Sequence, residues 1–522
     1  MRALFFILAV SGVGALNFLV YNPMFGRSHV TFMGKLVDVL VDAGHNVTMI
    51  GPEIEASLGS YGTKKGDLIR IPQCKAAADF EDDFHNFVAS AWKAKGFLEI
   101  VGSFHRIVDV WEQSCAATLD HPGLMERLRG QHFDAAFSEG VDYCGAVIFH
   151  LLGINKTATT MSTASAEGFF AVTGNPSFPS YVPSILSDTG EKMTFLERVL
   201  NTLPLFIVPH FMGYFTGPFE TMTKERYGPQ FPSMMSLLSR ASMTFLNDEP
   251  LIEFPRPTTH NIVDIGGISV SGGPKHLNAS WDAIFNLRPK TVLLSFGTVA
   301  RSYLMPPEYK ETIRDTFRKF PDVTFIWKYE RPEDKISDGI ENIVESTFVP
   351  QNDMLYDRRL SLFITHCGQG STTESTTAGI PLIVIPVLGD QKRNAQVIKR
   401  IGSGVTLSKE MLNGTDALEV ALREVLSNPK YTEKARQVGK MIRDKPFSAR
   451  ETFVRNMEFI AKYGPLRQLD HYGKQLNFFQ YYLIDVFAFL MTVLLLVLLV
   501  IFFIARMIVR CALRRFVKVK VE

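Results

Sequence analysis

The sequence contains few cysteines for its length, and their spacing forms no close pairs. The five cysteines among 522 residues are Cys74, Cys115, Cys144, Cys367 and Cys511. This spacing argues against a disulfide-built scaffold and against a zinc cluster, and it leaves open one bridge in the part before the C-terminal apolar run. The fold must therefore depend on a hydrophobic core, and a composition with 46% hydrophobic and 21% charged residues is typical of a globular protein.

Charge of either sign is not in excess. The formal net charge is only +2, and no basic stretch alternates with aromatic residues in the middle of the chain. This balance argues against a nucleic acid partner. The chain also lacks a Gly-x-Gly-x-x-Gly turn after its first predicted strand and any Asp-x-Asp motif. We therefore expect neither a nicotinamide cofactor nor a bound metal ion.

The N-terminal residues have the pattern of a signal peptide. Met1-Arg2 precedes an apolar run that ends near Val10, and the small residues Gly14 and Ala15 follow. The run is too short to span a bilayer, so we predict a cleaved signal peptide over 1–15. The alternative is a buried first strand, although we expect that strand at 16–21.

The C-terminal region contains a run that is long enough to cross a membrane. Residues 486–505 carry no charge. At about 1.5 Å per helical residue they cover the roughly 30 Å hydrocarbon core. Tyr481 and Tyr482 precede the run, and six basic residues lie in the tail 506–522. The positive-inside rule places that tail in the cytosol, so the sequence predicts a type I protein with a lumenal body.

The end of the tail also matches an address signal. Lys520 and Lys518 stand at the third and fifth positions from the carboxyl end. That spacing resembles the dilysine signal for the endoplasmic reticulum, although a basic tail provides such lysines by chance as well. Asn-x-Ser/Thr sequons in the predicted lumenal part allow N-glycosylation, and they occur at Asn46, Asn155, Asn278 and Asn413.

Two α/β units follow one another along the chain. The first begins with a strand at 16–21, a turn, a helix at 29–43 and a strand at 47–50. The second begins near residue 291 with strands at 292–295, 323–329, 360–365 and 382–385 and helices between them. Alternating strands and helices predict parallel sheets covered on both faces. We therefore expect an α/β fold with two doubly wound, Rossmann-like domains that face each other across a ligand cleft.

We place the domains at 16–260 and 261–450. A helical return segment follows at 451–485, and then the transmembrane helix at 486–505 and the basic tail at 506–522. Within the first domain, 199–215 is apolar but interrupted by Pro204, Pro209 and His210. These residues argue against a regular membrane span. The segment could line an apolar pocket, contact the bilayer surface or form an ordinary pair of core helices.

The stretch 348–391 carries the strongest chemical pattern. A predicted strand runs into His366-Cys367-Gly368-Gln369-Gly370-Ser371, and a helix with Glu374 in its first turn follows. A glycine-rich turn before a helix directs backbone N–H groups and the positive helix end at a phosphate. His366 can add a hydrogen bond or a positive charge, and Glu374 can accept from ribose hydroxyls. Asp390 and Gln391 could bind neighbouring hydroxyls of a sugar.

Taken together, this stretch resembles the signature of the UDP-glycosyltransferase family, in the style of the membrane-bound UDP-glucuronosyltransferases of animals. The resemblance extends over nearly the whole chain, including Leu294-Ser295-Phe296-Gly297-Thr298 and Phe325-Ile326-Trp327-Lys328. It implies a GT-B architecture, a UDP-sugar donor and a small lipophilic acceptor. Gly370 departs from the family pattern, because many members have Asn there.

The resemblance also assigns residues to the donor. Gln351 and Asn352 match positions near the uracil and ribose. His366, Gly368, Ser371 and Glu374 match the phosphate and ribose positions, and Thr298 matches a hydroxyl residue near the diphosphate. Lys328 ends the strand that leads towards the donor, and Asp390 with Gln391 matches the sugar contacts.

A catalytic pair is expected in the first domain. Histidine titrates near neutrality and suits a general base, and Gly26-Arg27-Ser28-His29 matches the family turn that carries this base. The family orients its histidine with an Asp after an N-domain strand, and Glu139 stands at that position here. Asp142 is a nearby substitute, and Asp134, at the start of the strand, is the poorer candidate.

The predicted reaction is displacement at the anomeric carbon with inversion. His29 deprotonates the acceptor, and UDP leaves with stabilisation from His366 and backbone amides. Glucuronate is the preferred sugar and glucose the second choice. A sugar-nucleotide-binding protein without catalysis is the alternative of a different class, and Glu139 and Gly370 favour it.

Overall fold

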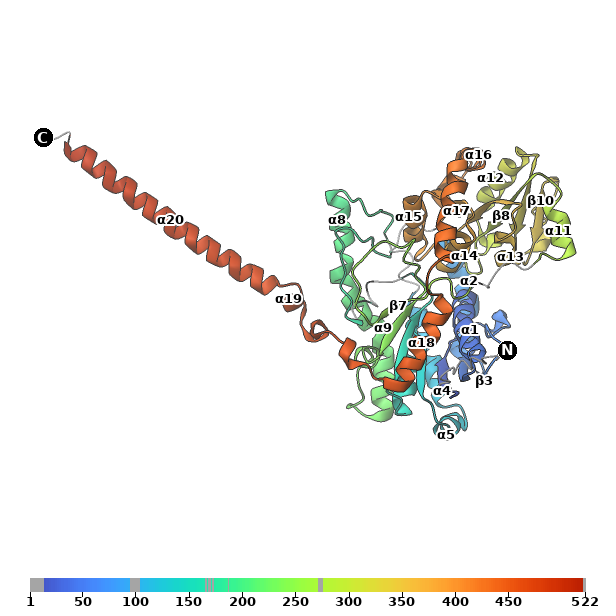
Figure 1. Ribbon diagram of the computed structural model, residues 1–522, viewed down its shortest axis with the longest axis horizontal. Helices are drawn as coiled ribbons and strands as arrows, with labels where there is room; N and C mark the ends of the chain where they lie inside the picture. The colour runs from blue at the N-terminus through green and yellow to red at the C-terminus, as the bar shows by residue number, and fades with distance from the viewer. Residues whose placement is uncertain are drawn as a thin grey trace, which may run out of the picture. The chain divides into compact units, whose positions relative to one another are not determined.

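The computed structural model describes residues 14–519 apart from 94–103, 165–166, 168–169, 171–172, 186 and 271–275 (Figure 1). The chain divides into two compact units, Met1–Leu469 and Asp470–Glu522. Most of the predicted signal peptide at 1–15 lies outside the described residues, as does the C-terminal lysine of the predicted dilysine signal, Lys520.

The first sheet has seven parallel strands in the order β3-β2-β1-β4-β5-β6-β7. The strands are β1 (Asn17–Tyr21), β2 (Asn46–Pro52), β3 (Asp67–Ile71), β4 (Ala135–Glu139), β5 (Thr157–Met161), β6 (Met243–Leu246) and β7 (Ile262–Asp264). The order reverses between the neighbours β1 and β4. In a doubly wound sheet, the crevice beyond the carboxyl ends of such a strand pair is the usual ligand site.

The second sheet has six parallel strands in the order β10-β9-β8-β11-β12-β13. The strands are β8 (Lys290–Ser295), β9 (Val323–Lys328), β10 (Ile343–Ser346), β11 (Leu360–Thr365), β12 (Leu382–Val384) and β13 (Gly404–Thr406). The order reverses here between β8 and β11. Both sheets therefore have the Rossmann-like organisation that the alternating pattern predicted.

Helices cover both sheets, as expected for parallel strands that are buried on both faces. In the first half they are α1 (Arg27–Asp42), α2 (Lys75–Lys93), α4 (Phe104–Leu119), α5 (Leu124–Arg129), α6 (Cys144–Leu151), α8 (Phe195–Thr202), α9 (Pro204–Tyr227) and α10 (Met234–Leu238). In the second half they are α11 (Ala279–Phe285), α12 (Pro307–Arg318), α13 (Gln351–Leu355), α14 (Gln369–Ala378), α15 (Gln391–Ile401), α16 (Ala417–Ser427) and α17 (Pro429–Arg443).

The two halves exchange elements. β7 belongs to the first sheet although it lies after the boundary that we placed at residue 260. Helix α18 (Ala449–Tyr463), in the predicted return segment, lies beside α1 and contacts β4 and β5 of the first sheet (Figure 1). Its Phe453 is fully buried and packs edge-on against Phe137 and Phe245, with ring centroids 5.7 and 4.9 Å away. The first core is thus completed by a late segment of the chain.

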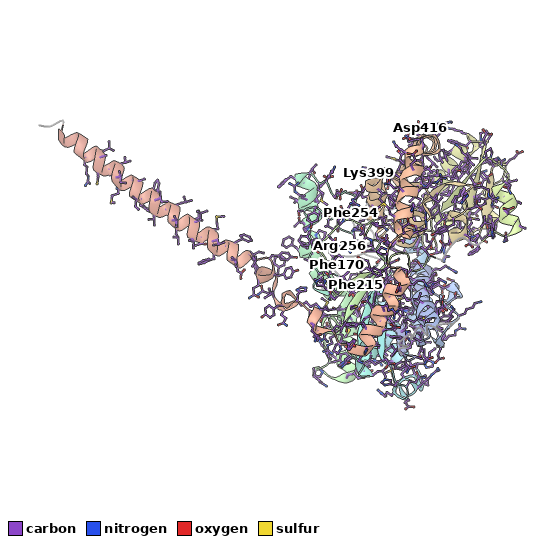
Figure 2. The ribbon with its side chains drawn as sticks, in the orientation of Figure 1. Phe170, Phe215, Phe254, Arg256, Lys399 and Asp416 are labelled. Carbon is purple, nitrogen blue, oxygen red and sulfur yellow. A yellow bond between two sulfur atoms is a disulfide. The ribbon has the colours of Figure 1, made fainter. Side chains whose placement is uncertain are left out.

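Trp92 makes the opposite exchange. It lies in the last turn of α2, in the first half, yet it is fully buried in the core of the second sheet, where its ring centroid lies 5.0 Å from that of Phe296. Figure 2 shows that the segment with Phe254 and Arg256 also lies where the two halves meet. Phe254 packs there with Val397 and Ile442 of the second half.

One disulfide bridge joins Cys115 in α4 to Cys144 at the start of α6. The sequence had left a single bridge open, and Cys74, Cys367 and Cys511 are free thiols. The bridge fixes the helix that follows the end of β4 and so supports the position of Glu139.

Helices α8 and α9 are unusually apolar on the outside. Phe195 is 75% exposed and Leu196 is 64% exposed, and Leu200, Leu203, Phe206 and Ile207 are also exposed. This exposure argues against an ordinary buried helix pair, which was one of the three alternatives for 199–215. By length and composition, the stretch Phe195–Tyr227 is also long and apolar enough for a membrane span, with a mean hydropathy of 1.2.

The C-terminal unit contains α19 (Phe478–Tyr481) and α20 (Ile484–Val519). The predicted transmembrane segment 486–505 lies inside α20, and the stretch Ile484–Arg514 has a mean hydropathy of 3.3. This helix is the second candidate span, and its large apolar side chains are exposed in the structure.

Candidate active site

The two predicted catalytic residues occupy the switch point of the first sheet. His29 lies in the first turn of α1, which follows β1, and Glu139 is the last residue of β4. Because β1 and β4 are neighbouring parallel strands, their carboxyl ends meet at one edge. Gly26 precedes α1 with a φ of 66°, a conformation that glycine adopts without strain, and this turn brings the imidazole back over the sheet edge.

His29, Glu139 and Ser162 form a hydrogen-bonded cluster. Nδ1 of His29 lies 2.8 Å from Oε1 of Glu139 and 2.8 Å from Oγ of Ser162. Ser162, just after β5, also donates its backbone N–H to Oε1 of Glu139 at 3.1 Å, and its hydroxyl donates to the same oxygen. Among the described residues, the hydrogen bonds to the imidazole involve Nδ1, so Nε2 is the nitrogen that can receive a proton from an acceptor.

The electrostatics of this cluster favour a charged pair. Burial lowers the pKa of His29, but the carboxylates of Glu139 and Asp390 outweigh it, and the net pKa is raised. Burial raises the pKa of Glu139, but His29 and the two donors of Ser162 outweigh it, and the net pKa is lowered. The carboxylate thus stays ionised and stabilises the imidazolium that forms when His29 takes up a proton.

The two other acidic candidates lie elsewhere. Asp142 is fully buried and accepts the N–H of Cys144 at 2.7 Å, and it makes no hydrogen bond to His29 in the described part of the chain. Asp134 accepts the N–H of Asn17 at 2.8 Å, at the opposite end of the strands. Glu139 is therefore the acidic residue that the fold places against His29.

The switch point of the second sheet carries the predicted phosphate residues. Gly297 and Thr298 follow β8, and His366 follows β11. A Cβ on Gly297 would lie 2.5 Å from Cε1 of His366, and a Cβ on Gly368 would lie 2.8 Å from its Nε2. The absence of side chains on Gly297 and Gly368 thus leaves room for the imidazole of His366. This imidazole is buried and lies near the N-terminal end of α14.

His366 is a neutral group in this environment. Burial, and in second place the nearby Lys328, lower its pKa to about 3. Of the two roles left open by the sequence, the structure therefore favours a hydrogen bond over a positive charge. Lys328 contributes the cation, and it donates to the carbonyl of Gly297 at 2.5 Å and to Glu330 at 3.1 Å.

A second group of predicted donor residues gathers at α13 and α14. Nε2 of Gln351 donates to Oε2 of Glu374 at 2.7 Å and to Oγ of Ser371 at 3.1 Å. Burial raises the pKa of Glu374 to about 7, although the bond from Gln351 opposes this. Oδ1 of Asn352 is buried and has no hydrogen-bond partner among the described residues.

Asp390 and Gln391 have different surroundings. Gln391 uses Oε1 to accept the N–H groups of Val387 and Leu388 at 2.7 and 3.0 Å, so it holds its own loop. Asp390 accepts the N–H of Ala164, in the first half, at 3.1 Å. Burial raises the pKa of Asp390, and Ala164, Asn394 and His29 partly offset this. The predicted sugar contact therefore faces the space that contains the His29 cluster.

Comparisons with known proteins agree with this geometry. The family described as "UDP-glucoronosyl and UDP-glucosyl transferase" matches residues 19–521. The chain is a UDP-glycosyltransferase.

Its relatives in the family include animal enzymes of similar length. The chain is 30% identical to ugt-47 of Caenorhabditis briggsae over 505 residues, which are 95% of this chain and 93% of the relative. It is 29% identical to UDP-glucuronosyltransferase 1A9 of Mus musculus over 510 residues, with the same coverage.

Solved structures similar to this UDP-glycosyltransferase include glycosyltransferases with the GT-B fold. The glycosyltransferase of kitacinnamycin has a TM-score of 0.56 at 17% identity and covers 86% of this chain and 99% of its own. The glycosyltransferase VinC, solved in complex with dTDP, has a TM-score of 0.56 at 16% identity and covers 86% of this chain and all of its own. The expected GT-B fold is confirmed.

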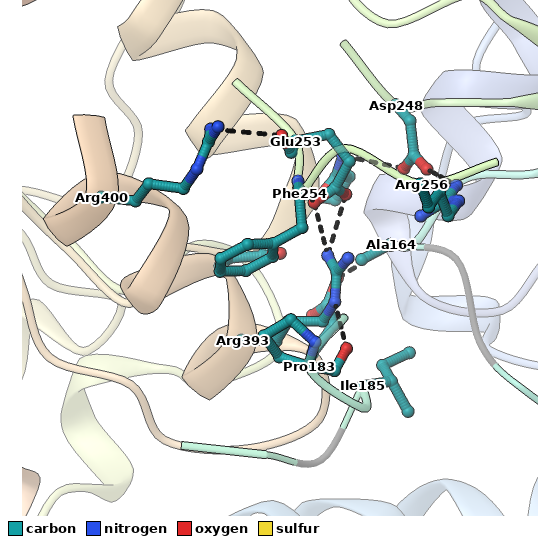
Figure 3. Close-up of polar contacts among 12 residues, drawn as sticks. Ala164, Pro183, Ile185, Asp248, Glu253, Phe254, Arg256, Arg393 and Arg400 are labelled. Carbon is teal, nitrogen blue, oxygen red and sulfur yellow. Dashed lines mark hydrogen bonds and ion pairs between the residues drawn. The ribbon is translucent and has the colours of Figure 1, made fainter. Parts of the chain in front are cut away.

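A buried polar cluster joins the halves of this UDP-glycosyltransferase close to the site (Figure 3). The fully buried Arg393 pairs with Glu253 at 2.8 Å and donates to the carbonyl of Pro183 at 3.2 Å. Arg256 pairs with Asp248 at 2.8 Å (Figure 3). Its guanidinium also lies over the ring of Phe170, 4.7 Å from the ring centroid. Breaking one partner of such a buried pair costs about 3–5 kcal/mol.

Sequence reasoning missed Ser162, Ala164 and this polar cluster. A signal for Ser162 was present, because polar Ser162-Thr163 follow a strand next to β4, where the same carboxyl-end rule applies. No local pattern marks Ala164, since it acts through its backbone. The asparagines of the four sequons are all exposed.

Proposed function

We propose that this enzyme transfers a sugar, in first place glucuronate, from a UDP-sugar to a hydroxyl of a small lipophilic acceptor with inversion of the anomeric carbon. One observation carries the proposal. His29 is held by Glu139 and Ser162 on the first sheet, while Asp390 of the second half is hydrogen-bonded to Ala164 and acts on the pKa of His29. His29 and the loop of the second half that carries Asp390 therefore face one space.

The chemistry follows from the positions of the groups. The acceptor O–H gives its proton to Nε2 of His29, and its oxygen forms the new bond to the anomeric carbon as the bond to UDP breaks. Glu139 stabilises the resulting imidazolium. The diphosphate leaves against the loop with Thr298, neutral His366, the cation Lys328 and the N-terminal end of α14. Gln351, Asn352, Ser371 and Glu374 would hold the uridine, and Asp390 with Gln391 the sugar.

The donor sugar is proposed from the relatives. The curated relatives compared above include a named UDP-glucuronosyltransferase, and the family description covers glucosyl transfer as well. UDP-glucose is therefore the second candidate. We propose that no cofactor other than the UDP-sugar takes part and that the reaction needs no metal ion.

The membrane location is also a proposal. The predicted signal peptide, the apolar helix α20 and the basic tail support a type I protein of the endoplasmic reticulum with the catalytic domains in the lumen. The disulfide Cys115–Cys144 supports an oxidising compartment. The exposed apolar side chains of α8 and α9 support a second contact with the bilayer, in its interfacial region.

The test uses microsomes that contain the full-length chain. They are incubated with radiolabelled UDP-glucuronate or UDP-glucose and a panel of phenols, with and without EDTA, and the His29→Ala variant is the comparison. We expect transfer from UDP-glucuronate that resists EDTA and falls at least about 10³-fold in the variant. Unchanged transfer in His29→Ala would exclude the proposed base. UDP binding without transfer from any donor would favour the binding protein without catalysis.

A further inference from the structure

Glu55 is a buried carboxylate that touches both halves of the active site. It lies just after β2 and is 6% exposed. Oε2 accepts the backbone N–H of Gly26 at 3.1 Å, and Oε1 faces the guanidinium of Arg301 at 3.4 Å and the hydroxyl of Ser57 at 3.5 Å. A buried carboxylate that uses its two oxygens in two directions links the groups on either side.

On the first side, Glu55 holds the turn that carries His29. Gly26 accepts the N–H groups of His29 and Val30 at 3.0 and 3.2 Å and so starts α1. A Cβ on Gly26 would lie 3.2 Å from Cδ2 of His29, so this peptide lies against the imidazole. The N–H of Glu55 also donates to the carbonyl of Met24 at 2.9 Å. The N-cap residue Gly26 has no side chain that could cap α1, and Glu55 anchors this turn by accepting its backbone N–H.

On the second side, Arg301 ends the donor loop that contains Gly297 and Thr298. Its N–H donates to the carbonyl of Val299 at 2.8 Å. The next residue, Ser302, donates its N–H to Glu330 and its hydroxyl to the carbonyl of Lys328, and Lys328 reaches back to Gly297. The donor loop is therefore one hydrogen-bonded unit, and a displacement at Gly297 or Thr298 moves Arg301 as well.

Apolar contacts bring the same two segments together. Val299 and Leu304 of the second half pack against a cluster of the first half that includes Ile54 and Phe84, next to Phe25. Phe25 precedes Gly26, and Ile54 precedes Glu55. The polar link thus lies inside a packed contact between the turn of the base and the donor loop.

We propose that Glu55 is a positioning residue that orients the His29 turn and, through Arg301, makes this orientation depend on the state of the donor loop. The proposal rests on the proposed function, in which His29 is the base and the loop with Thr298 meets the diphosphate. Binding of the donor fixes the donor loop and, with it, Arg301. The guanidinium of Arg301 then pairs with Oε1 of Glu55, and Oε2 of Glu55 accepts the backbone N–H of Gly26. The imidazole of His29 is then held most firmly in its reactive orientation when the donor is bound. In the enzyme without donor, the His29 turn is held less firmly.

The two functions of Glu55 can be separated by substitution. In Glu55→Gln, the amide oxygen can still accept the N–H of Gly26, whereas the amide nitrogen cannot pair with a guanidinium. Gln should keep this orientation because the Gly26 N–H is buried, while Arg301, with a side chain that is 24% exposed, can be solvated. Glu55→Ala removes both contacts, and Arg301→Gln removes only the link to the donor loop.

The experiment measures kcat, donor KM and acceptor KM of the full-length enzyme for Glu55→Gln, Glu55→Ala, Arg301→Gln and the double variant Glu55→Gln/Arg301→Gln. We expect donor KM to rise about three- to tenfold in Glu55→Gln and in Arg301→Gln, with kcat within about twofold of wild type, because a partly exposed pair contributes little more. The double variant should equal the single ones. In Glu55→Ala, kcat should also fall about 10- to 100-fold, and the acidic limb of its pH profile should shift.

The matched control is Glu53→Gln. Glu53 lies two residues earlier and pairs with Tyr61 and with Arg70 at 2.5 Å, all within the first half. Its substitution should change neither donor KM nor kcat. An effect of Glu53→Gln equal to that of Glu55→Gln would show that loss of any carboxylate here disturbs the fold, and it would overturn the proposal.

Other results also overturn the proposal. One is that Glu55→Ala keeps the wild-type kcat and donor KM. Another is that the effects of Glu55→Gln and Arg301→Gln on donor KM add up in the double variant. A third is that the acceptor KM of these variants rises as much as the donor KM. If Glu55→Ala does not fold, Glu55→Gln and Arg301→Gln still decide the coupling. His29→Ala, measured in parallel, separates the two levels. If His29→Ala is inactive and Glu55→Ala is fully active, only the positioning role of Glu55 is rejected. If His29→Ala is fully active, the role of His29 as the base and the positioning role of Glu55 are both rejected.

Discussion

Nδ1 of His29 lies 2.8 Å from Oε1 of Glu139, with the two residues contributed by segments 110 positions apart in the chain. Glutamate is one methylene longer than the aspartate that the family resemblance led us to expect, and the helix start and strand end still bring the groups to hydrogen-bond distance. Ser162 holds the carboxylate from the other side. The imidazole is therefore held at Nδ1 by two residues of the first half.

The first prediction concerns Glu139→Gln. Without the carboxylate, the raised pKa of His29 should fall, because burial then dominates. A base must be neutral, so the acidic limb of the kcat/KM profile should move to lower pH. The rate should nevertheless fall about 10²–10³-fold at all pH values, since the imidazolium is no longer stabilised. The control is Asp142→Asn, which should keep its activity; equal losses in the two variants would contradict the assignment of Glu139.

The second prediction concerns stability and Asp142. Burial raises the pKa of Asp142 to about 7, above its ordinary value of 3.8. Between these values the folded protein holds a proton that the unfolded chain has lost, so the free energy of unfolding falls as pH rises, by at most about 1.4 kcal/mol per pH unit. Asp142→Asn removes this pH-dependent decrease in the free energy of unfolding. Its Tm should therefore be higher than that of the wild type at pH 8 and nearly equal to it near pH 4. Thermal unfolding across this pH range checks it, and a pH-independent difference in Tm would refute it.

The third prediction compares two glycines. Gly297 and Gly339 both have a left-handed φ, of 78° and 74°, but only Gly297 has a neighbour within 4 Å of an added Cβ, namely His366. Alanine at either position should cost about 1–2 kcal/mol of backbone strain. Only Gly297→Ala should also displace His366 and raise donor KM at least about tenfold. Steady-state kinetics with varied UDP-sugar tests this, and an equal donor KM in the two variants would exclude a role for the His366 packing.

The fourth prediction concerns α8 and α9. A chain that ends at Leu469 lacks α20 and should still bind vesicles through the exposed apolar side chains of these helices. The triple variant Leu196→Asp, Leu200→Asp, Phe206→Asp should reduce this binding at least about tenfold. The control replaces three exposed apolar residues of the second half, Leu287, Val420 and Met441, by Asp. Vesicle flotation measures the bound fraction, and equal loss in the control would argue against a specific surface.

Much of the fold could be predicted from local pattern. The strands of the second half followed from hydrophobic runs, and the turn that carries His29 followed from its glycine and proline residues. The helix predicted over 29–43 begins at Arg27, two residues earlier. The rule that ligands lie beyond the carboxyl ends of parallel strands pointed to His29, and the strand followed by a glycine-rich turn pointed to His366. The family resemblance assigned Glu139 and Thr298. These residues could be found from the sequence because each lies at the end of a strand or in the turn that follows it.

Other parts of the site could not be predicted, because they depend on contacts distant in the chain. Trp92 lies in the last turn of a helix of the first half, and nothing in its neighbourhood indicates a place in the second core. Ala164 contributes a backbone N–H, which any residue would offer. The pKa of His366 depends on burial and on Lys328, so the sequence left open whether the imidazole is charged.

The contact of α18 with the first sheet affects the order in which the polypeptide can fold during synthesis. Phe453, Met457 and Ile460 are fully buried against the first sheet, whose last strand, β7, ends at Asp264, long before the ribosome makes α18. Until that helix emerges, the nascent first domain keeps an open apolar face, whereas the second sheet has all its strands by Thr406. Translation therefore leaves the first domain unfinished while the donor half is made, with exposed apolar surface of the kind that favours aggregation.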